Sequence, residues 1–510
     1  MTVTTAPSLR FRQPDKMRRL EDLINLTAFG IFKIRRVVLA HGVFDLIHMG
    51  HVRHLEAAKR EGDVLIVTVT ADKFVNKGPD RPVFPAAMRA EMLAALECVD
   101  FVAISESASA IEAINTIKPD VYAKGSDYEN ASDDVTDSIA QERAAVESYG
   151  GRIVFTKGET FSSSALINKH LDVYDPPLRD YLAHARADIG LQPLLDLIES
   201  VKNYRVVLIG DTIIDEYNYV RPMGKATKDN IIATQFEKSE RFAGGVIATA
   251  NVVASFCREV EVITQLGLDD LEFVRSHLPA NVKLTPLIER AAVRKVRFVE
   301  INYMRKLFEV YYCDEQSFAR WIPLPGMAAP SLQKADVVIA NDFGHGMIIN
   351  HLQDNAPFLA VNAQTNAGNH GFNLITKYAK ADYVCLDAPE ARLAVQDRHS
   401  DIADVVQDKL ADAIDCSKII ITNGPQGCIT FERGNGPVTT IPAFTKNVVD
   451  TIGAGDAFLA VTAPLVRAGG KMEHVGMIGN AAGALKVGIV GHRQYVEKVP
   501  LVKFLTALMK

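Results

Sequence analysis

Short runs of hydrophobic residues alternate along the chain with longer stretches that are apolar on one face only. Between residues 36 and 156 the runs RVVLA, DVLIVTVT, DFVAI and GGRIVFT are typical of buried strands, and the segments between them have the spacing of amphipathic helices. Strands that alternate with helices predict βαβ units and a parallel sheet covered by helices. A second series begins at YRVVLIGD and continues to the end of the chain. The expected fold class is therefore α/β in both halves.

These patterns divide the chain into four parts. The polar and basic residues 1–33 predict an N-terminal arm, and residues 34–171 predict a first α/β domain. Residues 172–202 open with a proline pair and predict a helical connector, and residues 203–510 predict a second α/β domain. A length of 510 residues agrees with more than one hydrophobic core, because single domains usually hold about 100–200 residues.

Charge and cysteine content narrow the classes of function. A formal net charge of −6 gives no positive footprint for nucleic acid, although local loops can still bind small anions. The six cysteines form no CxxC pair, which favours free thiols and a cytoplasmic protein. The first residues lack the apolar core of a signal peptide, and no apolar run of about 18 residues appears, so no membrane partner is expected.

The first candidate site is the segment HGVFDLIHMGH, from His41 to His51, which follows a predicted strand and opens a predicted helix. Glycines there let the backbone approach a ligand, and amides at a helix N-terminus favour phosphate. His48 and His51 face the same way on one helical turn, so both can donate to phosphate oxygens. The alternatives for this pair are a zinc site, which would need a third ligand, and ordinary polar side chains.

VFDLIHMGHVRHL resembles the HxGH signature of the cytidylyltransferase-like superfamily, whose fold is Rossmann-like. Later segments resemble, in order, parts of the adenylyltransferase module of bifunctional heptose-phosphate enzymes: RPVFPAAMRAEMLAALECVDFV, KGSDY at 124–128 and FSSSALI at 161–167. The resemblance implies that a sugar phosphate attacks the α-phosphate of a nucleoside triphosphate and releases pyrophosphate.

The same resemblance suggests roles for individual residues, with His48 and His51 as the catalytic pair. The candidates for binding nucleotide or phosphate are Gly42, Val43, Phe44, Lys77, Arg89, Ser162, Ser163 and Ser164, with Arg81 as a further basic residue. The candidates for binding substrate are Asp45, Lys124 and Asp127. For the basic residues Lys77, Arg81 and Arg89 the alternative is a solvated surface charge.

The second candidate site is DTIGAGDAF at 450–458, a glycine-rich turn that runs into an apolar, helical stretch. Such a turn offers backbone amides to a developing anion. Asp456 stands where a carboxylate can take the proton of an attacking hydroxyl. A lone GxGD sequence can also be no more than a tight turn.

DTIGAGDAF resembles the DTxGAGD signature of the ribokinase-like sugar kinases, which implies an α/β domain with a small β lid. Asp456 would be the catalytic base, and the amides of Gly453, Ala454 and Gly455 would form the anion hole. Six further segments resemble that family in the expected order: IGDTIIDEY, RFAGGVIATAN, RKVRFV, NDFGHG, LDAPE and TNGPQG. His345 and Asp387 depart from the family pattern within NDFGHG and LDAPE.

This second resemblance also implies binding roles. The candidates for binding sugar are Asp211, Asp215, Gly244, Gly245 and Asn251, and those for binding nucleotide are Thr422, Gly424, Gly427 and Asn480. Glu390 would act indirectly on Mg²⁺, with ATP as a substrate.

Together the two halves resemble a bifunctional heptose-phosphate kinase/adenylyltransferase with its domain order reversed. The resemblance implies phosphorylation of D-glycero-D-manno-heptose 7-phosphate at O1, adenylylation of a sugar 1-phosphate, a role in lipopolysaccharide precursor synthesis and a homodimer. One alternative is a different CDP- or ADP-linked sugar or alditol for a surface polysaccharide. Another is a nucleotide-binding regulator without turnover, against which Asp456, His48 and His51 argue.

Overall fold

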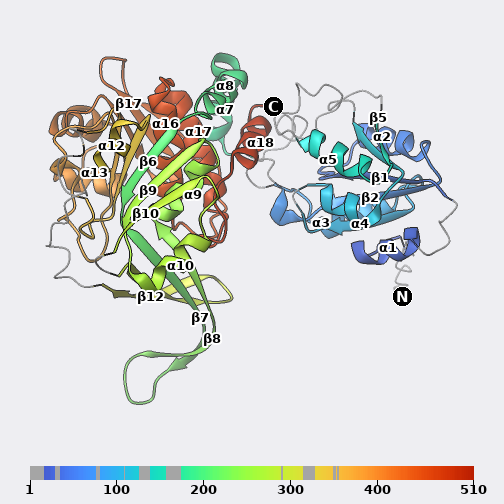
Figure 1. The fold of residues 1–510 in the computed structure, drawn as a ribbon, viewed down its shortest axis with the longest axis horizontal. Helices are drawn as coiled ribbons and strands as arrows, with labels where there is room; N and C mark the ends of the chain where they lie inside the picture. The colour runs from blue at the N-terminus through green and yellow to red at the C-terminus, as the bar shows by residue number, and fades with distance from the viewer. Residues whose placement is uncertain are drawn as a thin grey trace, which may run out of the picture. The chain divides into compact units, whose positions relative to one another are not determined.

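The computed structural model describes residues 16–28, 35–75, 81–107, 109–125, 138–156, 174–288, 291–313, 328–348, 352 and 355–510. The chain divides into two compact units (Figure 1). One comprises Met1–Tyr174 with Val502–Leu508 and Lys510, and the other comprises Asp175–Leu501 with Met509. The boundary after Tyr174 falls inside the segment that the sequence predicts as a connector.

The first unit is built on a five-stranded parallel sheet with the order β3-β2-β1-β4-β5. Its strands are β1 (Val37–Gly42), β2 (Val64–Thr70), β3 (Phe101–Ser105), β4 (Val121–Gly125) and β5 (Arg152–Thr156). Its helices are α1 (Leu20–Ala28), α2 (Met49–Lys59), α3 (Ala86–Ala94), α4 (Ile111–Ile117) and α5 (Ser138–Glu147), with a 3₁₀ turn η1 (Asp72–Phe74).

Helices cover both faces of this sheet, which explains why β2 is buried along its whole length. One hydrophobic cluster joins the sheet to Leu55 of α2 and Leu93 of α3, and a second joins it to Leu23 of α1 and Ile114 of α4. The chain order reverses between β1 and β4. Open α/β sheets bind ligands at the carboxyl ends of the strands beside such a point, where the first histidine motif begins.

The second unit contains a nine-stranded sheet with the order β10-β9-β6-β13-β14-β15-β16-β17-β18. Neighbouring strands from β10 to β16 are parallel, whereas β17 and β18 run antiparallel to their neighbours. The strands are β6 (Arg205–Gly210), β9 (Glu259–Gln265), β10 (Val282–Leu287), β13 (Val337–Asp342), β14 (Leu359–Ala363), β15 (Tyr383–Asp387), β16 (Lys418–Thr422), β17 (Cys428–Glu432) and β18 (Thr439–Ile441).

The helices that belong with this sheet include α9 and α17, which both pack against α16. The helices of this unit are α7 (Pro176–His184), α8 (Gln192–Ser200), α9 (Val246–Ala254), α10 (Leu268–Ser276), α12 (Ala328–Gln333), α13 (Ala388–Ala394), α14 (Ile402–Asp404), α15 (Ala411–Ala413), α16 (Ala454–Arg467) and α17 (Met472–Lys486). The last helix, α18 (Lys498–Leu508), is divided between the two units after Leu501. Short π or 3₁₀ segments are η4 (Ala185–Ile189), η6 (Ile375–Lys377), η7 (Val405–Leu410) and η8 (Gly424–Gln426).

A separate four-stranded sheet forms a lid on the second unit, with the order β12-β11-β7-β8. Its strands are β7 (Thr212–Lys225), β8 (Ile232–Gly245), β11 (Val293–Glu300) and β12 (Arg305–Tyr312). The half of β7 nearest the main sheet is buried and the far half is exposed, so β7 and β8 project as an arm (Figure 1).

The predicted α/β class is confirmed, since each unit is centred on a mainly parallel sheet covered by helices. Within the described ranges, no helix is both long enough and apolar enough to cross a membrane.

Two candidate active sites

The candidate catalytic turn of the second unit, residues 450–456, ends in the first turn of α16. Gly453 caps α16 with a φ of +76°, a left-handed conformation that favours glycine. A Cβ at this position would lie 2.5 Å from Cε1 of His492, so side-chain volume is excluded as well. No side chain caps this helix. The N–H of Ala454 donates to the carbonyl of Thr451 at 3.2 Å. The amides that follow it in the first turn have no partner inside the helix and are available to an anion.

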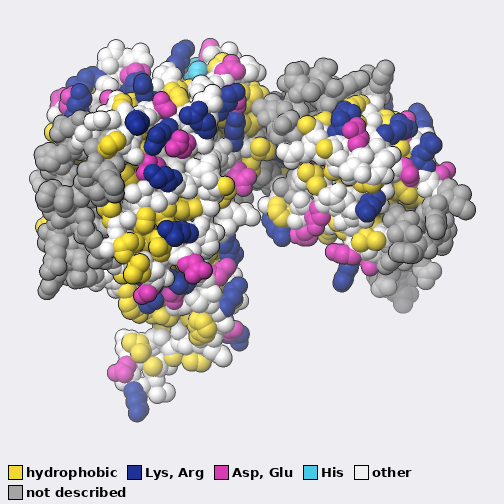
Figure 2. Space-filling view, in the orientation of Figure 1, with side chains coloured by type: hydrophobic (Ala, Val, Ile, Leu, Met, Phe, Trp, Pro, Cys, Tyr) yellow, Lys and Arg dark blue, Asp and Glu magenta, His cyan; other side chains and the backbone are white. Residues whose placement is uncertain are grey.

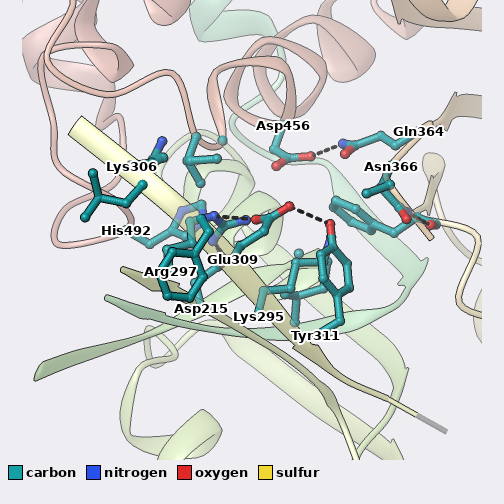
Figure 3. A pocket seen from close by; sticks show the side chains of 18 residues that line it. Asp215, Lys295, Arg297, Lys306, Glu309, Tyr311, Gln364, Asn366, Asp456 and His492 are labelled. Carbon is teal, nitrogen blue, oxygen red and sulfur yellow. Dashed lines mark hydrogen bonds and ion pairs between the residues drawn. The ribbon is translucent and has the colours of Figure 1, made fainter. Parts of the chain in front are cut away.

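Asp456 lies in that first turn and lines a cavity (Figure 3). Its Oδ1 accepts a hydrogen bond from Nε2 of Gln364 at 2.7 Å and a longer one from Nδ2 of Asn341 at 3.4 Å. Burial raises the pKa of Asp456 above its usual value, although the nearby His492 and the two amides act in the opposite direction. The carboxyl is thus positioned and tuned as a proton acceptor.

The cavity has a volume of about 470 Å³ and lies between the lid and the main sheet. Ten of the 18 residues that line it have charged or polar side chains, and these come from both the lid and the main part of the second unit (Figure 3). They are Asp215, Lys295, Arg297, Lys306, Glu309, Tyr311, Gln364, Asn366, Asp456 and His492. A cavity of this size and polarity suits a small, charged, hydrogen-bonding substrate.

Asp215 is the centre of the charge network on the lid. It forms an ion pair with Arg297 and lies 3.5 Å from Nε2 of His492. Burial by itself would raise the pKa of Asp215, but His492 and Arg297 together lower it to about 2. Arg297 also contacts Glu309 at 3.1 Å, and the Tyr311 hydroxyl donates to Glu309 at 3.0 Å. Asp215 is therefore ionised at neutral pH and can accept hydrogen bonds from sugar hydroxyls.

The structure brings only some of the predicted sugar-binding residues to this cavity. Asp215 and Gly245 line it, together with Gly453 and Asp456. Asp211 has a different position, because its carboxylate accepts the backbone N–H groups of residues 343, 345 and 347 and so holds that loop. This contact explains its burial without a ligand.

Gly244 and Asn251 shape the neighbourhood of the cavity. A Cβ on Gly244 would lie 2.2 Å from Oδ2 of Asp215, so only glycine leaves that carboxylate in place. Asn251, in α9, donates to the carbonyl of His277 at 3.0 Å and borders a smaller chamber behind Asp456.

The predicted nucleotide-binding residues hold the backbone around β16–β18. Thr422 ends β16 and donates to the Leu386 carbonyl at 3.4 Å. Gly427 has a φ of +93°, and a Cβ there would lie 2.0 Å from the Ile441 carbonyl. Asn480 donates to the carbonyls of Ile441 and Pro442, at 3.2 and 2.8 Å. A Cβ added at Gly424, which has a φ of +51°, would meet nothing within 4 Å. The same holds for a Cβ added at Gly455 in α16.

Glu390 lies at the start of α13 in a capping box with Asp387. Its two carboxylate oxygens accept backbone N–H groups, from Thr365 at 3.0 Å and from Asp387 at 2.9 Å. Burial, followed by the neighbouring Asp387, raises the pKa of Glu390 to about 8. No cluster of three or more His, Cys, Asp or Glu side chains within the described ranges forms a metal site.

Of the ten charged and polar residues that line the cavity, eight were not among the predicted site residues: Lys295, Arg297, Lys306, Glu309, Tyr311, Gln364, Asn366 and His492. Lys295 and Arg297 lie two apart in β11, and residues at that spacing share one face of a strand. That alternation was a usable signal. His492 follows a glycine in a loop and belongs to no motif that the sequence displays.

In the first unit, the two histidines cap α2 through their ring nitrogens. Nδ1 of His48 accepts the N–H of Gly50 at 3.1 Å, and Nδ1 of His51 accepts the N–H of His48 at 3.4 Å. The rings stack with their centroids 4.0 Å apart. A neutral imidazole that accepts at Nδ1 carries its proton at Nε2. Both rings therefore present Nε2–H groups as donors.

Asp45 and Arg89 hold the loops around this motif. The Asp45 carboxylate accepts the N–H groups of residues 83 and 84, at 2.8 and 3.1 Å, and lies 3.8 Å from Arg81. Arg89 is fully buried, and each of its three nitrogens donates to a protein acceptor. These include the carbonyl of Val43 and the carboxylate of Asp72. These contacts give Arg89 a structural role, because it joins three loops, and its predicted contact with phosphate stays a prediction.

The remaining predicted residues of the first unit are placed as follows. Gly42 ends β1, and a Cβ there would lie 3.2 Å from the ring of Phe44. Phe44, with a φ of +53°, packs edge-on against His51. Lys124 forms a buried ion pair with Glu142 at 2.9 Å. Lys77, Asp127, Ser162, Ser163 and Ser164 lie outside the described residues.

Comparison with known families gives two separate matches. Residues 39–169 match the cytidylyltransferase-like family, and residues 347–498 match the pfkB family of carbohydrate kinases. These two regions are thus similar to the two families that the sequence motifs indicated, and each lies in a unit with the predicted α/β fold.

Individual relatives match only part of the chain. The bifunctional protein HldE of Trichlorobacter lovleyi is 38% identical over 178 residues, which is 34% of each chain. HldE of Methylobacillus flagellatus is 42% identical over 143 residues, or 28% of each chain. This chain thus spans about a third of the length of such relatives. Arabidopsis thaliana ribokinase, solved with ribose and ATP, has 15% identity and a TM-score of 0.46, over 60% of this chain and 99% of that one.

Proposed function

We propose that the chain is a bifunctional enzyme of activated-sugar synthesis. The second unit phosphorylates D-glycero-D-manno-heptose 7-phosphate at O1 with ATP. The first unit transfers AMP from ATP to the sugar 1-phosphate and releases pyrophosphate. The observation that carries the proposal is Asp456, which lines a charged cavity at the start of a helix that no side chain caps.

In the kinase step, Asp456 takes the proton of the attacking sugar hydroxyl as the bond to the γ-phosphorus forms. The amides that begin α16 bind the charge that develops on the transferred group. Asp215, held ionised by Arg297 and His492, orients the sugar by accepting hydrogen bonds from its hydroxyls. Because these groups are fixed by buried contacts, they need little rearrangement during the reaction.

The positive charges of the cavity support a phosphorylated sugar as the substrate. Arg297 is paired with Asp215 and Glu309, and Lys306 lies 2.6 Å from Asp450. Lys295 is buried, lines the cavity and packs over the ring of Tyr311. An ammonium in this position favours an anionic group on the sugar, such as a phosphate distant from the reacting hydroxyl.

Mg²⁺ fits this site only through the nucleotide. Both oxygens of Glu390 accept backbone N–H groups, so its carboxylate suits a contact through water better than direct coordination. Mg²⁺ usually keeps several waters and binds through substrate phosphates, where it neutralises their charge.

In the transferase step, the Nε2–H groups of His48 and His51 donate to oxygens of the α-phosphate. Their paired orientation supports this role, since both Nδ1 atoms are fixed by backbone amides. Most of the catalysis is then positioning and charge stabilisation.

A substrate screen tests the proposal. The full-length protein is incubated with each of ATP, CTP, GTP and UTP and a panel of sugars, sugar phosphates and sugar 1-phosphates, and products are identified by mass. We expect ATP-dependent formation of a heptose bisphosphate and formation of an ADP-sugar with pyrophosphate. A CDP-linked product would change the nucleotide assignment, and no turnover with any pair would reject both activities.

A homodimer formed through the lid belongs to the same proposal. Large hydrophobic side chains are exposed on the lid strands, and some are visible over the arm of β7 and β8 (Figure 2). They are Met223, Ile232, Phe236, Phe308, Val310 and Tyr312. A second copy of the same sheet would cover this apolar surface.

Light scattering tests the dimer. It should give twice the chain mass for the parent protein and one chain mass for the Phe236→Asp variant. A monomeric parent would contradict the dimer.

A further inference from the structure

A buried lysine lies directly behind the catalytic turn. Lys486 is the last residue of α17, and only 3% of its surface is exposed. Its Nζ donates to the carbonyl of Ile452 at 2.8 Å and to the carbonyl of Gly491 at 2.6 Å. Ile452 immediately precedes Gly453, and Gly491 immediately precedes His492. The ammonium therefore joins the turn that carries the anion hole to the loop that carries a cavity-lining histidine.

Asp450 contacts the same two residues, but through their N–H groups. Its Oδ1 accepts the N–H of Ile452 at 3.1 Å, and its Oδ2 accepts the N–H of Gly491 at 2.8 Å. The lid also reaches Asp450, through the Tyr217 hydroxyl at 2.7 Å and Lys306 at 2.6 Å. The Asp450 carboxylate thus holds the N–H groups of Ile452 and Gly491, while the Lys486 ammonium holds their carbonyls. These four hydrogen bonds restrict the conformation of the catalytic turn.

The charge of Lys486 is also close to the reacting groups. A Cβ on Gly453 would lie only 3.2 Å from Cε of Lys486. Lys486 borders a chamber of about 20 Å³ that is also lined by Asp456, Asn251 and His492. A space of that size holds one water. Burial lowers the pKa of Lys486 to about 8, with Asp450 and Asp456 acting to raise it, so the group is charged at neutral pH.

We propose that Lys486 is a positioning residue of the kinase site, whose ammonium fixes the catalytic turn and places a positive charge behind the anion hole. The inference rests on the proposed kinase function. The charge favours the ionised form of Asp456 before the reaction and the negative γ-phosphoryl group during it, and both effects are strong in a buried site. Lys486 acts through the turn and does not touch the sugar, so its loss should change kcat more than KM.

The test compares Lys486→Met, Lys486→Ala and Lys486→Arg in the full-length protein, with Lys418→Met as the matched control. Lys418 is a lysine of β16 that pairs with Glu432 at 3.6 Å. The assay is ATP-dependent phosphorylation of the best sugar phosphate from the screen. For Lys486→Met we expect kcat to fall about 10- to 100-fold, while KM for the sugar changes only a few-fold. The fall in kcat should not exceed the effect of deleting an anion-hole donor, which is roughly 10²–10³-fold.

Rescue and folding controls separate a role of the charge from a merely structural one. Methylammonium should restore part of kcat in Lys486→Ala in a saturable manner and should leave Lys418→Met unchanged, and Lys486→Arg should retain more activity than Lys486→Met. Pyrophosphate release by the first unit should persist in every variant and report an intact preparation. Unchanged kcat in Lys486→Met, or a loss that follows a lowered melting temperature and resists methylammonium, would overturn the inference. An inactive parent would reject the kinase function itself.

Discussion

The two candidate sites begin alike and differ in what caps the helix. Each is a turn that follows a strand and leads into the N-terminus of a helix. In the first unit the side chains of His48 and His51 engage the amides of residues 50 and 48. In the second unit, α16 begins at Gly453 with no side-chain cap. Under the proposed function, the first turn would therefore offer imidazole N–H groups to a phosphate, whereas the second would offer backbone N–H groups.

This difference determines which parts of each site a substitution can remove. Side-chain donors can be deleted one at a time, so the first site should respond directly to changes at His48 and His51. Backbone donors cannot be deleted, so the second site should respond to loss of its base or of the groups that tune it. The following variants test this contrast.

The largest effect is expected for Asp456→Asn. The amide keeps the shape of the side chain but cannot accept the proton of the sugar hydroxyl, and a general base is typically worth about 10²–10⁴-fold. Phosphorylation should fall by at least that factor, while calorimetry should find ATP binding retained. A variant that still turns over within a few-fold of the parent would remove Asp456 from the role of base.

His48→Asn separates capping from catalysis in the first site. The Asn side chain can still cap α2, so stability should be nearly unchanged. It lacks the Nε2–H donor, so pyrophosphate release should fall by about 10²-fold, as should that of His51→Ala. His399→Ala, at an exposed position, is the control. Equal pyrophosphate release in all three variants would place the chemistry elsewhere.

Arg89→Lys tests whether this residue has a structural role. Lysine keeps the charge but cannot donate to all the acceptors that Arg89 reaches, so the free energy of unfolding of the first unit should fall by about 2–4 kcal/mol. Thermal or urea unfolding measures the change. A raised KM for ATP with unchanged stability would instead restore the phosphate contact that the sequence suggested.

The smallest effect concerns the pH dependence of the kinase. Asp456 must be ionised to act as a base, so the rate should fall as the pH drops through its pKa, which burial raises above the usual value. The hydrogen bond from Gln364 opposes that shift by favouring the charged form. Gln364→Leu should therefore move the acid limb of kcat/KM to higher pH. A limb that stays in place, or moves to lower pH, would show that Gln364 does not tune this carboxyl.

Much of the fold follows from local patterns. The alternation of buried runs and amphipathic segments predicted two parallel sheets, and buried strands such as β2 carry that signal in every residue. The two turns were also visible, because HGVFDLIHMGH and DTIGAGDAF each resemble a family signature.

The charged lining of the cavity was less accessible, because it is assembled from segments distant in sequence. Lys306 lies against Asp450 and Arg297 against Asp215, separations of 144 and 82 residues. Arg89 shows the converse limit. Its charge suggested phosphate, but only the folded loops reveal the carbonyls that it binds.

The central claim is that two independent sites in one chain hold phosphate by different means, and a crossed assay tests it most directly. Asp456→Asn and His48→Asn are each measured for sugar phosphorylation and for pyrophosphate release on the same preparations. We predict that Asp456→Asn loses only phosphorylation and that His48→Asn loses only pyrophosphate release, each by about 10²-fold or more. If either variant lost both activities while remaining folded, or lost neither, the claim of two separate sites would be wrong.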